Sequence, residues 1–252
     1  MRIVDGNNLL HRVADGVGYG VHPVREVYSR FCSPPETTII VWDGPYSKKR
    51  RQEIFPEYKS NRRPKEESKF QFFEIAKGVL RFTPVIQIEI PGWEADDIIG
   101  TLINKYHKKY NLVVETNDGD YWQHKDKCLL PLVTKKWHGM SADECLLYKS
   151  TVGESKGEGT GIKGFGIKAW EALNDETKRG MILAAKLEDQ DRFFTLTDLP
   201  KKFRTTEAFG QMCLCWKLKS YWTVPEEEID KHIQQGRLSI PAAEIFMEKF
   251  LI

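Results

Sequence analysis

Three short apolar runs in this chain each end in an Asp-Gly pair, and this shared ending limits the possible folds more than any other feature. The runs lead into Asp5, Asp43 and Asp118. Short apolar runs bounded by turn residues are typical of the buried strands of a parallel sheet. Ligand sites of open parallel sheets lie outside the carboxyl ends of the strands. We therefore predict an α/β fold with a central, mostly parallel sheet and with these three aspartates at one edge of it.

Residues 92–120 add further carboxylates. Glu94, Asp96 and Asp97 directly precede a run of apolar residues at helical spacing, and Asp120 closes the stretch. This pattern predicts an amphipathic helix whose first turn carries three acids, a position that the helix dipole favours. The alternative interpretation is an ordinary charged helix start followed by an Asp-Gly turn. Neither of those features needs so many carboxylates.

Seven carboxylates would share the pocket at this edge. Carboxylates packed so closely cannot all stay ionised unless protons or cations intervene. Oxygen ligands without His or Cys favour magnesium or manganese over zinc. Two such ions about 4 Å apart are the usual arrangement for in-line attack on a phosphodiester. The predicted metal ligands are Asp5, Asp43, Glu94, Asp96, Asp97, Asp118 and Asp120.

Basic residues are unevenly distributed along the chain. The 38 Lys and Arg against 36 Asp and Glu give a net charge of +2, which by itself does not indicate a nucleic-acid partner. Residues 48–69, however, hold nine basic residues against four Glu, interleaved with aromatic residues such as Tyr58. These basic side chains can neutralise phosphates, and Tyr58 can stack on an unpaired base. The alternative is a solvated charged helix. Arg12, just beyond the first strand, could hold another phosphate.

Five segments carry a family resemblance. They read D-G-N-N-L-L-H-R, W-D-G-P, P-E-Y-K-S-N-R, G-W-E-A-D-D-I-I-G-T-L and T-N-D-G-D. Together they resemble the phage and bacterial 5′ nucleases, the family of flap endonucleases and 5′–3′ exonucleases that also supplies the nuclease domain of bacterial DNA polymerase I. The match covers roughly residues 1–175, in family order and at family spacing. It implies a PIN-like nuclease core, a helical arch and a C-terminal helix–three-turn–helix lobe.

The resemblance also implies roles for individual residues. The seven carboxylates take the places of the family's metal ligands. Tyr58, Lys59 and Arg62 take places at the base of the arch, the gateway for single-stranded 5′ ends. There Lys59 and Arg62 would contact the scissile phosphate as catalytic residues, beside developing negative charge.

A glycine-rich segment at residues 153–170 resembles the helix–three-turn–helix, which grips the backbone of duplex DNA. Its closely spaced glycines let backbone N–H groups approach a phosphate. The DNA-contacting residues implied here are Lys163, Gly164, Gly166 and Lys168. The family often holds a potassium ion in this loop through main-chain carbonyls, which here would be those of Ile162 and Gly164.

One metal position departs from the family pattern. Where the family usually has G-D-x-x-D-N, this chain has G-E-S-K-G-E, so one Asp is replaced by Glu154 and the other aligns with Gly157. Glu154 then becomes the eighth predicted metal ligand. Either Glu158 supplies the missing carboxylate or the second ion binds weakly.

We therefore expect a metal-dependent, structure-specific 5′ nuclease that hydrolyses DNA phosphodiesters at 5′ flaps and 5′ ends by a two-metal-ion mechanism. The alternatives are a DNA-junction binding protein with impaired cleavage, owing to a depleted second metal site, and a ribonuclease of related fold. The expected domains are an α/β nuclease core at residues 1–140, with the arch at about 45–70, and a helical DNA-binding lobe at residues 141–252 packed on the core. In this lobe, one helix is predicted from Pro225 to about Gly236 and another from Pro241.

The cysteines and the hydropathy pattern indicate the compartment. The five Cys form no C-x-x-C pair, which fits a reducing environment with neither a disulfide framework nor a zinc module. No apolar run approaches the roughly 20 residues of a membrane span. We expect a cytoplasmic monomer without a membrane partner, in the host cytoplasm if a phage encodes it.

Overall fold

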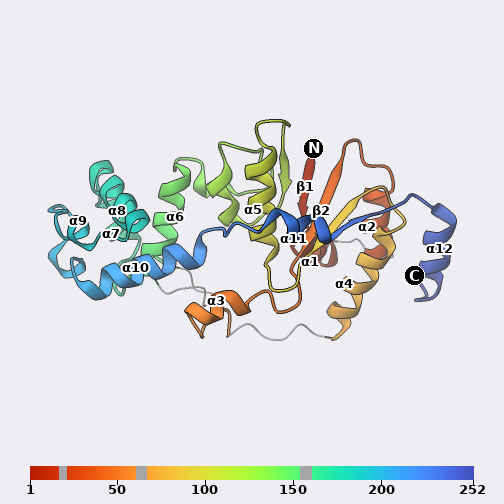
Figure 1. Cartoon of the computed structure of the whole chain (residues 1–252), viewed down its shortest axis with the longest axis horizontal. Coiled ribbons are helices and arrows are strands. Elements are labelled where there is room, and N and C mark those ends of the chain that lie inside the picture. Colours follow the sequence, from red (N-terminus) through yellow and green to blue (C-terminus); the bar gives the residue numbers. More distant parts are fainter. Residues whose placement is uncertain (17–21, 61–66, 154–160) are drawn as a thin grey trace. The chain divides into compact units, whose positions relative to one another are not determined.

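A computed structural model describes residues 1–16, 22–60, 67–153 and 161–252 (Figure 1). The chain divides into two compact units. The α/β unit comprises Met1–Ser47, Arg63–Val133 and Tyr221–Ile252. The helical unit comprises Lys48–Arg62 and Thr134–Ser220.

The α/β unit is built on a five-stranded sheet with the strand order β4-β1-β2-β3-β5. Four neighbouring strands are parallel, and only β5 runs antiparallel, beside β3. The strands are β1 (Arg2–Asp5), β2 (Thr38–Trp42), β3 (Ile86–Glu89), β4 (Val113–Glu115) and β5 (Ile233–Gln235). The predicted α/β fold with a mostly parallel sheet is therefore confirmed.

Both faces of this sheet are covered, because successive side chains of a strand point to opposite faces. On β1, Val4 packs in one hydrophobic cluster with side chains of α1, α2 and α4, and Ile3 packs in a second cluster with side chains of α5. The helices of the unit are α1 (Gly6–Gly16), α2 (Pro23–Phe31), α4 (Glu67–Leu80), α5 (Ala95–Tyr106), the 3₁₀ helix η1 (Gly119–His124), α11 (Glu226–Lys231) and α12 (Ile240–Glu248). No described helix is long and apolar enough to cross a membrane.

In the helical unit, α10 packs on α6 and α8. A capping box starts α6: the Ser141 hydroxyl accepts from the Glu144 N–H at 3.2 Å, and the Glu144 carboxylate accepts from the Ser141 N–H at 2.8 Å. The elements of the unit are α3 (Lys49–Ile54), η2 (Lys135–Trp137), α6 (Ala142–Thr151), α7 (Ile167–Glu171), α8 (Asp175–Leu187), α9 (Gln190–Phe194), η3 (Lys201–Phe203) and α10 (Thr206–Lys219).

The C-terminal 32 residues differ from the prediction of a single helical lobe at residues 141–252, because Tyr221–Ile252 belongs to the α/β unit. The helix predicted from Pro225 to about Gly236 ends at Lys231, and Ile233–Gln235 forms β5 instead. The edge of β3 explains this change. Its backbone N–H and C=O groups on that side need partners, and Ile233–Gln235 pairs with them as a strand in the register Ile88↔Ile233. Ala243 and Met247 of α12 then pack into the core of the same unit.

Candidate metal centre at the carboxyl edge of the sheet

The three Asp-Gly aspartates follow three adjacent parallel strands. Asp5 is the last residue of β1, Asp43 follows β2 directly, and Asp118 lies three residues beyond β4. Asp5 is buried, and its pKa is raised to about 7, first by burial and then by the charges of Asp43 and Asp118. A hydrogen bond from the Asn8 N–H at 3.0 Å lowers this pKa only in part. The three aspartates therefore lie close enough to repel one another.

Glycine follows Asp5 and Asp43 for a steric reason. A Cβ atom at Gly6 would lie 2.3 Å from the Trp42 ring, and one at Gly44 would lie 1.8 Å from the carbonyl oxygen of Ile90. After β1 and after β2, the backbone of the glycine therefore lies in direct contact with a neighbouring segment of the chain. Only glycine permits so close an approach.

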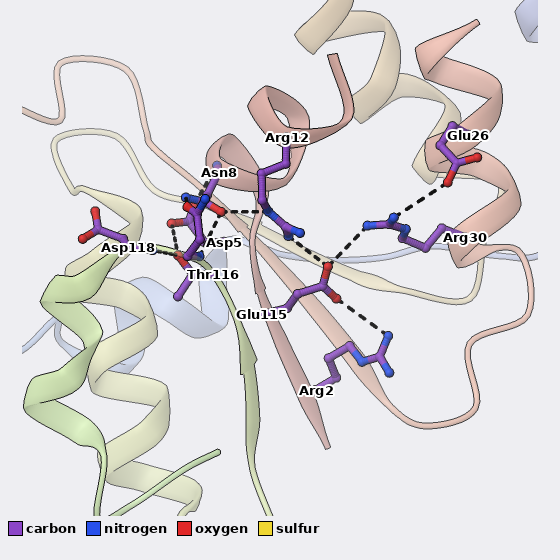
Figure 2. A network of polar contacts seen from close by, with 10 residues as sticks. Arg2, Asp5, Asn8, Arg12, Glu26, Arg30, Glu115, Thr116 and Asp118 are labelled. Carbon is purple, nitrogen blue, oxygen red and sulfur yellow. Dashed lines mark hydrogen bonds and ion pairs between the residues drawn. The ribbon is translucent and has the colours of Figure 1, made fainter. Parts of the chain in front are cut away.

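A polar network joins the ends of β1 and β4 (Figure 2). The Thr116 hydroxyl donates to Asp5 at 3.3 Å and accepts from the Asp118 N–H at 3.1 Å. From the other side, the Asn8 amide donates to the Asn117 side-chain oxygen at 2.6 Å. These bonds fix the positions from which Asp5 and Asp118 project.

Asp43 joins the same edge to the start of α5. Its Oδ1 accepts from the Ala95 N–H, the first of the helix, at 2.8 Å, and its Oδ2 accepts from the Asn7 amide at 2.5 Å. A carboxylate in this position satisfies one of the unpaired N–H groups at a helix start and is favoured by the helix dipole. The strand-end acids and the acids of α5 are thereby brought together.

The α5 acids are held individually. Glu94 is buried at the N-cap position, and Asp97, 1% exposed, accepts from the Trp222 N–H at 2.8 Å. Asp96 accepts from the Tyr121 hydroxyl at 2.6 Å. Burial and the charges of Asp96 and Asp5 raise the pKa of Tyr121 well above its ordinary value, so that this hydroxyl stays protonated and can donate.

Asp120, the last acid predicted from residues 92–120, lies at the start of η1. Its N–H donates to Asp118 Oδ1 at 2.8 Å, so the two acids are tied together through the backbone. In the described residues, nevertheless, no three His, Cys, Asp or Glu side chains meet in an arrangement that could hold a metal ion. The carboxylates accept instead from neighbouring N–H and O–H groups, which is expected where like charges repel.

The chemistry of the donor set still fits a hard divalent cation. The seven predicted ligands in the α/β unit offer only oxygen atoms, which Mg²⁺ and Mn²⁺ prefer. Burial and the charges of Asp43 and Asp118 raise the pKa of Asp5, so a cation beside this carboxylate would favour its ionised form. Glu154, the eighth predicted ligand, lies outside the described residues, as do Gly157 and Glu158. The ligand set remains a prediction.

Arg12, predicted to hold a phosphate, is engaged within the unit. Its guanidinium donates to Glu115 at 2.9 Å and to the Asn8 side chain at 3.1 Å, and Arg2 and Arg30 also pair with Glu115 (Figure 2). Arg12 thus supports the residue whose backbone N–H holds Asp5. A role in DNA binding remains a prediction.

The predicted arch residues lie in the helical unit. Tyr58 is only 4% exposed, and Lys59 Nζ lies 5.0 Å from its ring centroid. The Arg51 guanidinium also lies over this ring, 5.9 Å from its centroid, and stacking of Tyr58 on an unpaired base remains a prediction. Lys59 itself is 8% exposed and has a left-handed backbone, with φ of 51°. Arg62 lies outside the described residues.

The described part of the glycine-rich segment is Gly153 and residues 161–170. The Ile162 N–H donates to the Thr151 carbonyl at 2.7 Å, which returns the loop to the end of α6. The four residues predicted to contact DNA, namely Lys163, Gly164, Gly166 and Lys168, are all exposed. A cavity of about 350 Å³ beside the loop is lined by residues that include Lys163, Lys202 and Phe203. The potassium site at Ile162 and Gly164 remains a prediction.

Sequence reasoning missed the residues that hold the acids in place. Tyr121, Thr116 and Trp222 each bond to an acid or to its backbone. Tyr121 stands beside Asp120 in the sequence, but no local pattern shows that it reaches Asp96, 25 positions away.

Comparison with known proteins places this fold in a known class. The T5 5′-exonuclease structure with bound divalent zinc ions superposes with a TM-score of 0.64 at 19% identity, covering 98% of each chain. The model of the family described as the 5′-3′ exonuclease N-terminal resolvase-like domain matches residues 21–152. The chain belongs to this family, and the resemblance drawn from its motifs is confirmed.

Two kinds of named relatives are similar to the chain. The flap endonuclease Xni of Aliivibrio salmonicida is 28% identical, over 95% of this chain and 97% of that protein. DNA polymerase I of Caldicellulosiruptor bescii is 28% identical over 69% of this chain and 24% of that protein, and the thermostable DNA polymerase I of Thermus aquaticus is 27% identical over 75% and 25%. The chain therefore spans about a quarter of the length of the polymerases that it matches.

Proposed function

We propose that this protein is a divalent-metal-dependent, structure-specific 5′ nuclease that hydrolyses DNA phosphodiesters at 5′ flaps and 5′ ends. The observation that carries the proposal is the position of Asp5, a buried carboxylate whose pKa is raised by burial and by the neighbouring Asp43 and Asp118. Such a group favours a cation beside it. Relatives named flap endonuclease support the choice of reaction. A solved structure of the same fold, at 19% identity, is that of a flap endonuclease with DNA and metal ions.

The acidic edge would hold two Mg²⁺ ions, with Mn²⁺ as a substitute. Its ligands in the α/β unit would come from the seven carboxylates, and Glu154 remains a ligand predicted from the sequence alone. Bound there, the ions would activate the attacking water and offset charge on the phosphate and the leaving oxygen. The protein's own contribution is orientation, since Asp43 and Asp97 are each held by a backbone N–H.

The helical unit would bind the DNA. Lys163 and Lys168 are exposed on the glycine-rich segment and would contact phosphates of the duplex, with a potassium ion bound by the carbonyls of Ile162 and Gly164. Lys59 and Arg62 would offset negative charge on the scissile phosphate. We expect the protein to act as a cytoplasmic monomer.

The test is cleavage of a 5′-end-labelled flap duplex with and without Mg²⁺, by the wild type and Asp43→Asn. Asparagine keeps the side-chain oxygen that accepts from Ala95 but loses the negative charge. The matched control is Asp126→Asn, because Asp126 is 72% exposed and lies outside the acidic edge.

We expect cleavage by the wild type and the control only when Mg²⁺ is present, and a loss of at least about 10³-fold in Asp43→Asn. Mg²⁺-independent cleavage, or full activity of Asp43→Asn, would contradict the proposal. Tight binding of the flap by the wild type without cleavage in Mg²⁺ or Mn²⁺ would favour the DNA-junction binder.

A further inference from the structure

Four residues connect the end of the helical unit to the acidic edge. Residues 221–224, here called the return segment, follow α10 and begin the last part of the chain that belongs to the α/β unit. The Trp222 N–H donates to Asp97 Oδ1 at 2.8 Å, and the Val224 N–H donates to the Thr101 hydroxyl at 3.0 Å. That hydroxyl in turn donates to the Asp97 carbonyl at 2.9 Å. The backbone of the return segment is thus fixed along the first turns of α5.

Tyr221 places an aromatic ring against the rings of His124 and Tyr121. Its ring lies 5.0 Å from that of His124 with an interplanar angle of 11°, and 5.5 Å from that of Tyr121 at 36°. A Cβ atom at Gly100 would lie 3.1 Å from both Tyr221 Cβ and His124 Nε2, so this packing lies directly against α5. The stack leaves Tyr121 little freedom to rotate.

Tyr121 in turn holds one of the predicted ligands. Its side chain is fully buried, and its hydroxyl donates to Asp96 Oδ1 at 2.6 Å. Two short connections therefore run from the return segment to the acidic edge. One passes from Tyr221 through Tyr121 to Asp96, and the other passes from Trp222 to Asp97.

We propose that Tyr121, seated by Tyr221 of the return segment, is a positioning residue that holds the Asp96 carboxylate in the orientation required by a divalent ion. The inference rests on the proposed function, since it assumes that Asp96 is a ligand. A hydrogen bond to one carboxylate oxygen restricts rotation of the group before the ion binds. Groups that orient metal ligands in this way commonly change metal affinity 10–100-fold when they are removed.

A purely structural role for Tyr121 makes a different prediction. A buried tyrosine hydroxyl needs an acceptor, and Asp96 could simply be that acceptor. In that case, removal of the hydroxyl would change the stability of the unit and leave ion binding unaltered. Ion binding, measured without DNA, therefore separates the two roles.

The test compares Tyr121→Phe with the wild type and with Tyr110→Phe, a control whose side chain is 51% exposed and lies beyond the end of α5. Mn²⁺ binding is measured by electron paramagnetic resonance in the absence of DNA, and folding is checked by thermal unfolding in chelator. We expect about 10-fold weaker Mn²⁺ binding in Tyr121→Phe and no change in Tyr110→Phe. Cleavage by Tyr121→Phe should approach the wild-type rate at saturating Mn²⁺, with KM for DNA unchanged.

A second pair of variants keeps the test decisive if Tyr121→Phe folds poorly. Tyr221→Phe retains the stacked ring and should bind Mn²⁺ like the wild type, whereas Tyr221→Leu removes the ring and should weaken binding about as much as Tyr121→Phe. Equal Mn²⁺ affinity in the wild type, Tyr121→Phe and Tyr221→Leu would overturn the positioning role and leave the proposed nuclease intact. A wild type that neither binds Mn²⁺ nor cleaves DNA would instead overturn the proposed function itself.

Discussion

The α/β unit contains 17 Lys and Arg against 22 Asp and Glu, a net charge of −5, whereas the helical unit contains 21 against 14, a net charge of +7. The whole-chain charge of +2 conceals this division. A negative unit is suited to cations and a positive unit to phosphates. Net charge is therefore more informative for each unit than for the whole chain.

Both units hold some cations in ion pairs and others over aromatic rings. In the α/β unit, Arg2, Arg12 and Arg30 all pair with Glu115, which cancels part of their charge. In the helical unit, several lysines lie over aromatic rings, at 4.8 Å for Lys178 on Trp170, 4.8 Å for Lys202 on Phe203 and 4.9 Å for Lys149 on Trp137. An aromatic ring holds a lysine in place without neutralising it. The charges of Lys178 and Lys202 are therefore not cancelled by their rings.

The largest effect should come from removing one charge at the acidic edge. Asp97→Asn keeps an oxygen that can accept from the Trp222 N–H, so we expect the fold to survive. Loss of a ligand charge should lower cleavage of the flap substrate by at least about 10³-fold. Rates are compared with those of Asp126→Asn. If Asp97→Asn cleaved the flap at the wild-type rate, Asp97 would not be a ligand of the metal site.

Lys59 should affect turnover more than binding. Lys59→Met keeps the aliphatic stem near Tyr58 but removes the charge, which matters most where negative charge develops in the transition state. We expect turnover to fall about 10²-fold and DNA affinity to change little. Lys49→Met, at an exposed position nearby in the sequence, is the control. Equal losses of turnover and affinity would indicate that Lys59 only binds a phosphate and does not act in the transition state.

The metal-free α/β unit should show two opposing pH effects. The pKa of His124 is lowered to about 4 by burial and by the neighbouring Lys127 and His107, and within the described residues neither of its ring nitrogens has a hydrogen-bond partner. The unfolded chain binds this proton near pH 6.5, so the stabilising effect of neutral His124 is lost as the pH falls from about 6.5 to 4, by at most about 3 kcal/mol. Asp5 has the opposite effect on stability. Because its pKa is raised to about 7, the stability that its protonated form contributes is lost as the pH rises from about 4 to 7.

Denaturant unfolding in chelator across pH 4–8 separates these effects. His124→Phe should remove the acid-side loss of stability, whereas His138→Phe, at an exposed position in the helical unit, should leave it unchanged. Asp5→Asn removes the opposing effect of Asp5. The free energy of unfolding should then fall more steeply with decreasing pH, as His124 is protonated on unfolding. An unchanged pH profile in His124→Phe would contradict its assignment as a buried neutral group.

The smallest effect concerns the positive unit. Lys163→Ala and Lys168→Ala should each flatten the salt dependence of duplex binding by about one counterion, because each would lose one phosphate contact. Lys105→Ala is the control, since Lys105 pairs with Glu226 in the α/β unit. Binding isotherms at several salt concentrations give the slopes. Unchanged slopes for both variants would place the duplex elsewhere on the protein.

The sequence predicts β1, β2 and β4 closely because each is a short apolar run that leads into an Asp-Gly turn. It does not predict β5, whose three residues are all exposed and show no apolar pattern, since only the edge of β3 selects them as a strand. The same limit applies to the site. The acids are visible as residue types, whereas the contact from Tyr121 to Asp96 and the burial of Tyr58 depend on tertiary packing.

The central claim, that the acidic edge takes up divalent cations, is tested most directly by calorimetric titration of Mn²⁺ into the metal-free protein in buffers of different ionisation enthalpy. Because the pKa of Asp5 is raised to about 7, much of this carboxyl is protonated at pH 6 and an ion must displace that proton. We expect Mn²⁺ binding to release protons at pH 6 and to release fewer protons at pH 8. In Asp5→Asn, the proton release at pH 6 should be lost. Absence of binding, or binding at pH 6 without proton release, would contradict the central claim.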